Sequence, residues 1–351
     1  MKKRSLFVLL MLVFSLLTGC AGTPVIYYTE CNCPGNHTDA TPENTPTPVQ
    51  GAVKTGLAIV ANAADSKNAA EVAYDVTYVA VTVDDKGVIG SCIIDSLGAK
   101  VTFDAAGAIT SDLTAAIPTK NELGDSYGMK AYGGAKYEWN EQAKALADYA
   151  VGKTVDELKN GAIDESGKAP AGSDLASTAT IYLGGYVSAI EKAVSNAAHL
   201  GAQAGDELRL AVISKLDSSV SASADKPGTA QLDSDVTALT LNNATITSCA
   251  IDSLQSKVSF DQTGTITTDL TAPILTKNEL GENYGMKAWG GAKYEWNEQA
   301  ASFAAYATGK TAPEVNSIAV NEKTAPTQPD LAASVTIAIG GFQALIAKAV
   351  Q

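Results

Sequence analysis

The sequence predicts an α+β fold built from two homologous domains, each an antiparallel sheet meander with packed helices. A block of 25 residues occurs twice, at 119–143 and 276–300, and the two copies are identical at 22 positions. Short alternating apolar segments separated by turn residues precede each block, and residues with helical spacing follow it. Strands that come before helices, rather than alternating with them, favour an antiparallel sheet covered by helices.

The repeat sets the expected domain boundaries. Trp139 and Trp296 in the two blocks lie 157 residues apart, whereas Thr180 and Thr336 lie 156 residues apart, so one residue is lost between these points. A repeat of this length is a whole domain of ordinary size. We therefore expect two homologous domains, at 52–203 and 204–351.

The N-terminal residues are typical of an export signal. Residues 1–4 are basic, and residues 6–17 form an apolar run that is too short for a comfortable membrane-spanning helix. The following Leu17-Thr18-Gly19-Cys20 resembles the lipobox of bacterial lipoproteins. The resemblance implies a signal peptide at 1–19 and acylation of Cys20, so the mature chain would be lipid-anchored at the extracytoplasmic face of the cell membrane.

Residues 20–51 are predicted to be a tether, because they are rich in Thr, Pro, Asn and Gly without apolar periodicity. Cys31 and Cys33 in the tether favour a local or intermolecular disulfide, or no function, over a metal site, since two cysteines alone do not bind a metal. Cys92 and Cys249 occupy equivalent positions of the repeats and are expected to be buried small hydrophobes.

Each half is predicted to begin with a meander of three strands. In the first half we expect strands at 72–83, 88–95 and 100–103, with a turn at Asp84-Asp85-Lys86-Gly87. In the second half we expect strands at 236–241, 244–252 and 257–260.

Helices are expected from the end of each block onward. Apolar residues have helical spacing within 137–151, and Gly152 is a natural residue to follow that helix. Thr154 with Glu157 has the spacing of a capping box for a short second helix, and Thr311 with Glu314 repeats it. Further along, the sequence favours a strand at 181–183 and terminal helices at 186–200 and 342–350.

Charge and residue types exclude several functions. A formal net charge of -13 with a pI near 4.6 argues against a nucleic-acid partner, because a phosphate-binding surface needs clustered Lys and Arg. The two histidines, His37 and His199, have no counterpart in the second domain, so a duplicated His-based mechanism is excluded. No nucleophile-base pair, glycine-rich phosphate loop of usual spacing or metal-ligand cluster is visible.

Two short segments, which we call the acceptor segments, are the leading functional candidates. They read Asp174-Leu175-Ala176-Ser177-Thr178-Ala179-Thr180 and Asp330-Leu331-Ala332-Ala333-Ser334-Val335-Thr336. In each, only small or aliphatic residues separate an acid from a threonine. The first resembles the acceptor motif of bacterial FMN-binding domains, in which a flavin transferase links FMN through its phosphate to the hydroxyl of the final threonine. The second departs from the motif at Ala333, Ser334 and Val335.

With the lipobox, the tether and the repeat, the chain resembles the flavinylated lipoprotein of flavin-based extracellular electron transfer in Gram-positive bacteria. The resemblance implies covalent FMN in phosphodiester linkage to Thr180 and Thr336, added by a flavin transferase. It also implies electron transfer from a membrane quinol-linked donor to extracellular acceptors such as ferric iron. The chain would then be an electron carrier rather than a substrate-specific enzyme.

Further residues are candidates for binding the cofactor. Ser177, Ser334 and backbone amides can donate to the phosphate. Asp174 and Asp330 are expected to orient the segment, to help the transferase place its metal, or simply to cap a turn or helix.

The repeated block is the candidate flavin cradle. Its aromatic rings offer flat apolar surface, and its lysines can stabilise the phosphate or the anionic reduced flavin. For each aromatic taken singly, core packing is the alternative, but identical polar residues in both copies favour a functional constraint. The aromatic candidates are Tyr127, Tyr137, Trp139, Tyr284, Tyr294 and Trp296, and the lysine candidates are Lys120, Lys130, Lys277 and Lys287.

An alternative function from a different class is a lipid-anchored binding protein for a small ligand or a cell-wall polymer. In that case the aromatic residues of the repeated block would form a surface that stacks on sugars. A reductase with its own substrate site is a weaker alternative, because the sequence shows no further catalytic cluster.

Overall fold

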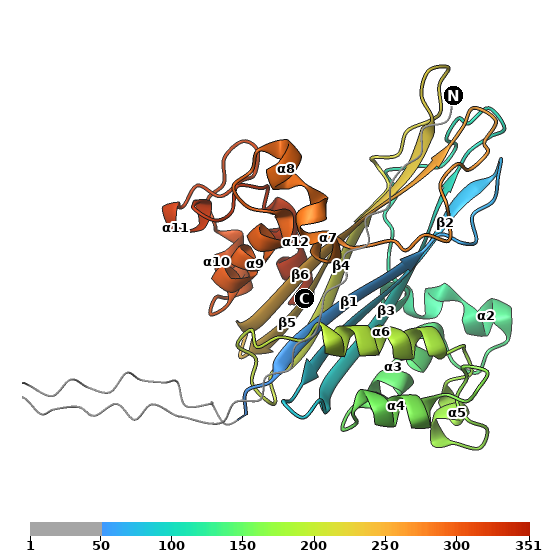
Figure 1. Ribbon diagram of the computed structural model, residues 1–351. Coiled ribbons are helices and arrows are strands. Elements are labelled where there is room, and N and C mark those ends of the chain that lie inside the picture. The colour runs from blue at the N-terminus through green and yellow to red at the C-terminus, as the bar shows by residue number, and fades with distance from the viewer. Residues whose placement is uncertain (1–50) are drawn as a thin grey trace, which may run out of the picture. The chain divides into compact units, whose positions relative to one another are not determined.

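The computed structural model describes residues 51–351, so the predicted signal peptide, Cys20, Cys31 and Cys33 lie outside the described residues. The described residues belong to one compact unit, Pro48–Gln351. Within them, no helix has the length and apolar character needed to cross a membrane. The fold is α+β, with two three-stranded antiparallel sheets and helices packed on them, as predicted (Figure 1).

Each sheet is a meander whose strands lie in chain order. The first sheet holds β1 (Lys54–Asn62), β2 (Glu71–Val83) and β3 (Ile89–Thr102), and the second holds β4 (Glu207–Lys215), β5 (Gly228–Asn242) and β6 (Thr245–Phe260). Every adjacent pair of strands is antiparallel, and a register shift occurs near the β2–β3 turn and again near the β5–β6 turn.

The strands differ from the prediction in two ways. The expected strands at 88–95 and 100–103 are one continuous strand, β3, because Ser96 and Gly98 pair with Thr77 and Asp75 of β2. The expected strands at 244–252 and 257–260 are likewise one strand, β6. In addition, the prediction omits β1 and β4, the first strand of each sheet.

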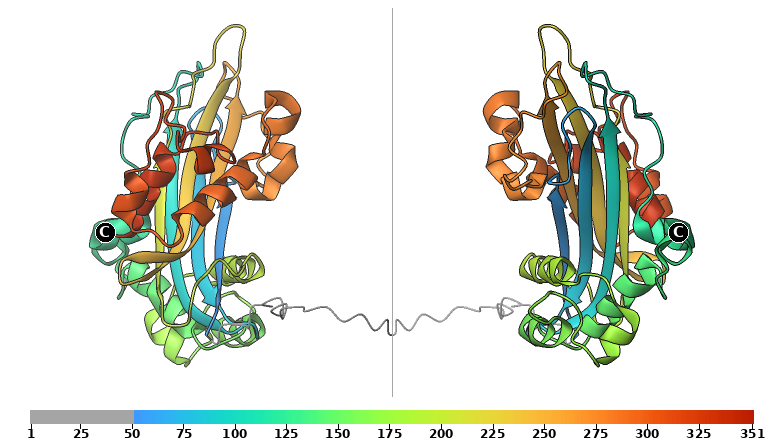
Figure 2. Two further views of the ribbon diagram at one scale, coloured as in Figure 1. Left: turned by 90° about the vertical axis from the view of Figure 1, so that its left-hand side faces the viewer. Right: turned by 90° about the vertical axis from the view of Figure 1, so that its right-hand side faces the viewer.

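The two sheets pack face to face and share one hydrophobic core. Buried side chains from both sheets meet there, including Tyr74 and Leu97 of the first and Leu232 and Leu254 of the second. Figure 2 shows the strands of the two sheets running alongside one another. The halves of the chain therefore share buried apolar surface instead of having only separate cores.

Aromatic and polar contacts also join the two sheets. Phe103 and Phe260 stack with ring centroids 4.1 Å apart and an interplanar angle of 3°. The Tyr78 hydroxyl lies 2.8 Å from the Ser234 hydroxyl, and burial raises the pKa of Tyr78. These contacts tie the two repeats together. The domain boundary expected between residues 203 and 204 stays a prediction.

Two ion pairs cross between the halves in a reciprocal manner. Lys192 in the first half pairs with Glu279 in the second, with an Nζ–Oε1 distance of 2.7 Å. Lys348 in the second half pairs with Glu122 in the first. The same type of contact made in both directions indicates that the two repeats are arranged with approximate twofold symmetry.

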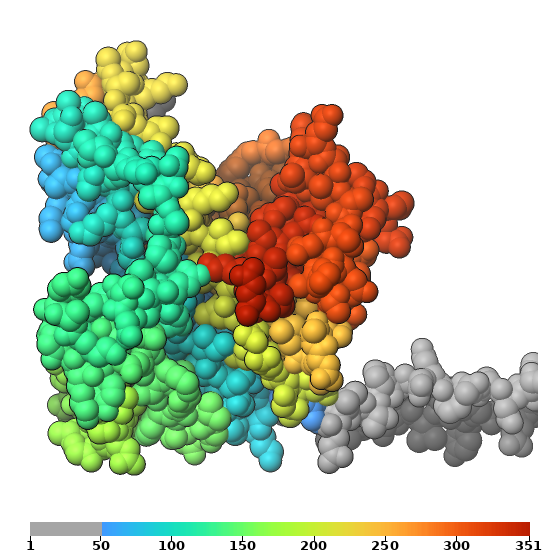
Figure 3. All heavy atoms as spheres, turned by 180° about the vertical axis from the view of Figure 1, so that it is seen from behind, coloured from blue at the N-terminus to red at the C-terminus, as the bar shows by residue number. Residues whose placement is uncertain are grey.

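Helices cover the outer face of each sheet (Figure 1). In the first half they are α1 (Lys120–Leu123), α2 (Met129–Gly133), α3 (Trp139–Ala150), α4 (Val155–Ala162), α5 (Asp174–Thr178) and α6 (Gly184–Ser195). In the second half they are α7 (Lys277–Leu280), α8 (Met286–Gly290), α9 (Trp296–Ala307), α10 (Ala312–Asn316), α11 (Pro329–Ala332) and α12 (Gly340–Ala349). Each helical layer forms its own core with its sheet. In space-filling view the two layers, green and orange to red, occupy separate parts of the surface (Figure 3).

Several local predictions for the helices are confirmed. The Thr154 and Glu157 capping box is present, with the Thr154 amide 2.8 Å from Glu157 Oε2, and Thr311 with Glu314 repeats it. Gly152 follows α3 with a φ of +80°. Cys249 is buried as expected, and burial raises the pKa of its thiol to about 11. Cys92 is partly buried and packs against the core between the first sheet and its helices.

The expected strand at 181–183 is wrong. These residues have no regular secondary structure, the Leu183 amide donates to the Gly167 carbonyl at 2.8 Å, and α6 begins directly afterwards at Gly184. The terminal helices therefore start two residues earlier than predicted, and α6 ends at Ser195 instead of 200.

Candidate functional site

The first candidate feature is a lysine placed beside two aromatic rings in each repeat, which we call the lysine–aromatic cluster. In the first half, Lys120 Nζ lies 5.4 Å from the ring centroid of Tyr127 and 5.1 Å from that of Trp139. These distances are within the range of cation–π attraction. In the second half, Lys277 Nζ lies 5.2 Å from Tyr284 and 4.9 Å from Trp296.

A buried carboxyl group places the helix that carries this lysine. Asp95 in β3 accepts a hydrogen bond from the Asn121 amide at 3.1 Å, and the Asn121 side chain donates to the Ile94 carbonyl at 2.9 Å. Burial raises the pKa of Asp95, and it raises the pKa of the equivalent Asp252 to about 6. Asp252 makes the matching bond to the Asn278 amide at 3.1 Å. Helices α1 and α7 are therefore fixed to their sheets by the same device.

A second buried carboxylate organises the middle of the block. Glu138 is 1 % exposed and accepts from the amides of Met129 at 2.8 Å and Lys130 at 2.9 Å, so its charge stabilises the start of α2. It also precedes α3 and forms a capping box with Glu141. Glu295 repeats these contacts with Met286 and Lys287. The polar residues shared by the two blocks thus build the local backbone.

The predicted tryptophans are core residues in this structure. Trp139 is 3 % exposed and Trp296 is 6 % exposed, and both belong to the outer cores. Trp139 Nε1 donates to the Tyr186 hydroxyl at 3.0 Å, whereas Trp296 meets the apolar ring of Phe342. Their role in binding a flavin stays a prediction, and the more accessible ring of the first cluster is that of Tyr127, which is 38 % exposed.

Tyr137 and Tyr294 lie two residues before the start of α3 and α9 and are partly buried. A neighbouring lysine sits over each ring, because Lys136 Nζ lies 4.8 Å from the Tyr137 centroid and Lys293 Nζ lies 4.8 Å from that of Tyr294. The backbone carbonyl of Tyr137 accepts from the Gln142 side chain at 3.0 Å.

The predicted lysines Lys130 and Lys287 are already paired with carboxylates. Lys130 Nζ lies 3.0 Å from Asp125 and 3.3 Å from Glu141, and these carboxylates raise its pKa. Lys287 pairs with Glu282 and Glu298 in the same way. Their charges are therefore balanced by close carboxylates, whereas the ion pair of Lys120 with Asp75 is longer, at 3.9 Å.

Both predicted acceptor threonines are exposed, and each is hydrogen-bonded to a buried glutamine of its own half. Gln142 in α3 accepts, through Oε1, from the Thr180 amide at 2.8 Å, the Thr180 hydroxyl at 3.1 Å and the Ile181 amide at 3.1 Å. Gln299 in α9 makes the same three contacts with Thr336 and Ile337, at 2.8, 3.1 and 3.2 Å. The acceptor segment thus packs on the helix that begins at the lysine–aromatic cluster.

The other predicted residues of the acceptor segments are either exposed or hydrogen-bonded within their own segment. Asp174 and Asp330 are exposed in the first turns of α5 and α11. The Ser177 hydroxyl donates to the Asp174 carbonyl at 2.6 Å. The Ser334 hydroxyl donates to the Leu331 carbonyl at 3.3 Å. Both serines are therefore bonded to their own helices.

A hollow adjoins each lysine–aromatic cluster. The first holds about 570 Å³ and is lined by Lys120 and Tyr127 together with Asp75, Glu71 and Lys100. The second holds about 310 Å³ and is lined by Lys277 together with Asp233, Asp235 and Lys215. Charged groups of both signs line the two hollows.

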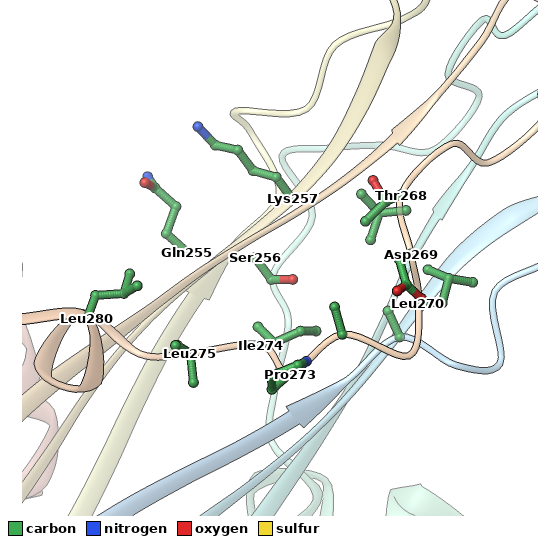
Figure 4. Close-up of a pocket in the computed structure, with 13 residues that line it drawn as sticks. Gln255, Ser256, Lys257, Thr268, Asp269, Leu270, Pro273, Ile274, Leu275 and Leu280 are labelled. Carbon is green, nitrogen blue, oxygen red and sulfur yellow. The ribbon is translucent and has the colours of Figure 1, made fainter. Parts of the chain in front are cut away.

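A separate apolar pocket lies between β6 and residues 268–275 (Figure 4). It holds about 270 Å³, and Val258, Leu270, Pro273 and Ile274 contribute to its lining. None of the predicted site residues lines it. Between residues 51 and 351, no group of three His, Cys, Asp or Glu side chains is placed to hold a metal ion.

Sequence reasoning missed two pairs of residues at this site. Gln142 and Gln299 belong to the polar residues that are identical in both copies of the block, but the sequence assigns neither of them a role of its own. Tyr132 and Trp289, which differ between the copies, are 91 % and 82 % exposed and lie over Gly128 and Gly285. The signal for the second pair was an aromatic residue kept at a position where the amino acid itself changes.

Comparison of the chain with protein-family models, with curated proteins and with solved structures gave no match.

Proposed function

We propose that this chain is an exported, lipid-anchored electron carrier that holds covalent FMN on Thr180 and Thr336. The observation that carries the proposal is the repetition of one arrangement in both halves. An exposed threonine hydroxyl is fixed to a buried glutamine, on the helix that begins at the lysine–aromatic cluster. The resemblance of the first acceptor segment to the motif of FMN-binding domains supports the same residues.

The residues present suit a flavin with a phosphate group. The hollows beside Lys120 and Lys277, about 570 and 310 Å³, fall in the range of small-molecule sites. Tyr127 lines the first hollow, whereas Tyr284 lies beside Lys277, with its ring centroid 5.2 Å from Nζ. Each lysine can balance negative charge on the flavin or its phosphate. Trp139 and Trp296 would support the lysines from the core side.

Backbone amides can supply donors for the phosphate oxygens. Helices α6 and α12 begin at Gly184 and Gly340, four residues after the acceptor threonines, and neither has a side-chain cap. Amides in the first turn of a helix lack partners within the helix and attract anions. The Gly184 amide already donates to the Gly167 carbonyl at 3.0 Å, and the Ser177 and Ser334 hydroxyls are bonded to their own helices. The amides that follow in the first turn are therefore the better candidates.

Bound FMN would supply reversible electron transfer, and the protein would set its orientation, charge balance and exposure. We propose that electrons arrive from a membrane quinol-linked donor and leave to extracellular acceptors such as ferric iron. Lys120 and Lys277 would favour the reduced, more negative form of the flavin. The exposed position of both threonines would give a flavin transferase access to each hydroxyl.

The test is intact and peptide mass spectrometry of the full chain produced with a flavin transferase. The unaltered chain should gain two FMN groups in phosphodiester linkage, and Thr180→Ala and Thr336→Ala should each remove one. Thr178→Ala is the matched control, because Thr178 lies in the same segment. Its hydroxyl lies 3.4 Å from the Ser177 hydroxyl and not against Gln142. Absence of flavin from the unaltered chain would refute the proposal.

A second candidate function, binding of a cell-wall polymer, is favoured by Tyr132 and Trp289. Their nearly complete exposure is unusual for large apolar side chains, and flat exposed rings stack well on sugars. Sedimentation with purified cell walls distinguishes the two functions. A polymer-binding protein should lose binding in a Tyr132→Ala, Trp289→Ala variant and keep it in a Thr180→Ala, Thr336→Ala variant.

A further inference from the structure

We infer that Gln142 and Gln299 are positioning residues that present the acceptor hydroxyls for modification and release them afterwards. This inference rests on the proposed function of Thr180 and Thr336. It concerns side chains that touch the acceptor residue without belonging to the acceptor segment, and it assigns each half its own positioning residue.

Each glutamine side chain forms hydrogen bonds through both its amide nitrogen and its amide oxygen. Both side chains belong to residues that are 0 % exposed. In the first half, Gln142 Nε2 donates to the Tyr137 carbonyl at 3.0 Å, while Oε1 accepts the three donors of Thr180 and Ile181. In the second half, Gln299 Nε2 donates to the Tyr294 carbonyl at 3.0 Å. The amide orientation is therefore fixed, because a flipped amide would set two oxygens against each other.

The position of Gln142 requires a side chain that both donates to the Tyr137 carbonyl and accepts from Thr180 and Ile181. A carboxylate keeps the acceptor for the threonine but loses the donor to the Tyr137 carbonyl. A methionine has a similar length, has no donor and is only a weak acceptor. Removal of the amide would leave the Thr180 and Ile181 amides without their present partner, and this loss would loosen the backbone that carries the acceptor hydroxyl.

The contact to the hydroxyl differs in kind from the contacts to the amides. The Thr180 and Ile181 amides keep Gln142 in place whether or not the hydroxyl is modified. When Thr180 Oγ1 forms a bond to the phosphorus of the flavin donor, its hydrogen leaves as a proton and the donor's phosphate leaving group departs. The oxygen can then no longer donate to Oε1, 3.1 Å away, and two acceptors face each other.

The structure thus assigns one position to the free hydroxyl and another to the esterified oxygen. Before transfer, the hydrogen bond holds the threonine side chain against α3. After transfer, the loss of that bond turns the oxygen and its attached group away from Gln142 by rotation about the Cα–Cβ bond. The backbone of the acceptor segment stays in place because its own two bonds to the glutamine remain.

The experiment compares Gln142→Met and Gln299→Met in the full chain, using a purified flavin transferase with its flavin donor and peptide mass spectrometry at both sites. Gln142→Met should slow addition at Thr180 by about ten-fold or more and leave the rate at Thr336 unchanged, and Gln299→Met should do the reverse. Each variant therefore carries its matched control within the same molecule. Gln142→Glu, which keeps the acceptor oxygen, should recover part of the rate.

Amide hydrogen exchange of the unmodified protein separates a positioning role from a purely structural one. Faster exchange at Thr180 and Ile181 in Gln142→Met, together with slower addition at Thr180, supports the inference. Faster exchange with an unchanged rate of addition would overturn it and leave Gln142 as a structural residue. If the unaltered chain gains no flavin, the proposed function itself fails, and the inference falls with it in a way that the wild-type control makes evident.

Discussion

The loops that precede α5 and α11 reach the same backbone conformation with different residues. Gly167 has a φ of +73° and Thr324 a φ of +58°, and each carbonyl accepts the amide that precedes the last helix of its half, at 2.8 Å. In the first half the ring of Tyr182 lies across Gly167. In the second half Ala338 stands in the place of Tyr182 and leaves room for a threonine side chain.

The cores beneath the acceptor segments show a similar exchange. Trp139 donates to the hydroxyl of Tyr186, whereas Trp296 packs edge-on against Phe342, and the ring centroids are 5.8 Å apart in both halves. The glutamine–threonine contacts, by contrast, agree to within 0.1 Å between the halves. Packing has therefore changed around an unchanged acceptor geometry.

The largest effect that tests the equivalence of the halves is a pH dependence. Burial raises the pKa of Asp252 to about 6, above its unfolded value, so the folded state binds the proton more tightly. Stability from this group is present below about pH 4 and is lost as pH rises toward 6, by up to about 3 kcal/mol. Urea unfolding between pH 4 and 7.5 should show that Asp252→Asn removes this fall.

Asp95→Asn is the matched variant in the first half, and its effect should have the same sign because burial raises that pKa as well. A difference between wild type and Asp252→Asn that does not change with pH would contradict the assignment. A pH effect from only one of the two variants would break the equivalence of the halves.

Exchanging the loop residues should cost stability in the first half. A Cβ at Gly167 would lie 2.2 Å from a ring carbon of Tyr182, and the backbone there is left-handed. Gly167→Thr should therefore destabilise the protein by about 2 kcal/mol, measured by urea unfolding. In a Tyr182→Ala background, which reproduces the second half, the cost should fall to the backbone strain alone. An equal cost in both backgrounds would show that the ring is irrelevant.

The core exchange should have a smaller effect. Tyr186→Phe removes the hydroxyl that accepts from the Trp139 indole N–H. The unpaired N–H should lower the free energy of unfolding by about 1 kcal/mol. The reverse change, Phe342→Tyr, offers Trp296 the missing acceptor and should stabilise the second half by a smaller amount. Destabilisation by both changes would mean that the two cores are less alike than their ring geometry indicates.

The smallest effect is expected at the strained threonine. Thr324 is a β-branched residue with a positive φ, a conformation that costs roughly 1–2 kcal/mol. Thr324→Gly relieves that strain but increases the freedom of the unfolded chain, so a net gain of about 0.5 kcal/mol is expected from thermal unfolding. A loss of stability would show that the threonine side chain makes a packing contribution larger than the strain.

Sequence patterns predicted the fold class, the meanders and the capping boxes because these depend on local signals. They divided β3 into two strands, because the signal at Ser96 and Gly98 is weak and only pairing with β2 extends the strand through them. They omitted β1, whose apolar run lacks clear alternation because side chains on both faces are buried. Tertiary contacts decided both cases.

The candidate site shows the same division. Small residues before a threonine pointed to Thr180 and Thr336, and the structure shows both to be exposed. The glutamine that holds each of them lies 38 or 37 residues earlier in the chain, so no local pattern joins the two. The burial of Trp139 and Trp296 was equally out of reach, because an aromatic residue before a helix reads the same whether it faces a ligand or a core.

The sheet-to-sheet core has a consequence for how the protein must be made. A chain ending near residue 203 would leave Tyr74, Tyr78 and Leu97 facing water on a broad apolar surface, without the strands that cover them in the complete protein. Such a fragment is expected to aggregate rather than to act as a carrier with one site. Both repeats therefore have to be synthesised as one chain, and loss of either one removes the support for both acceptor segments at once.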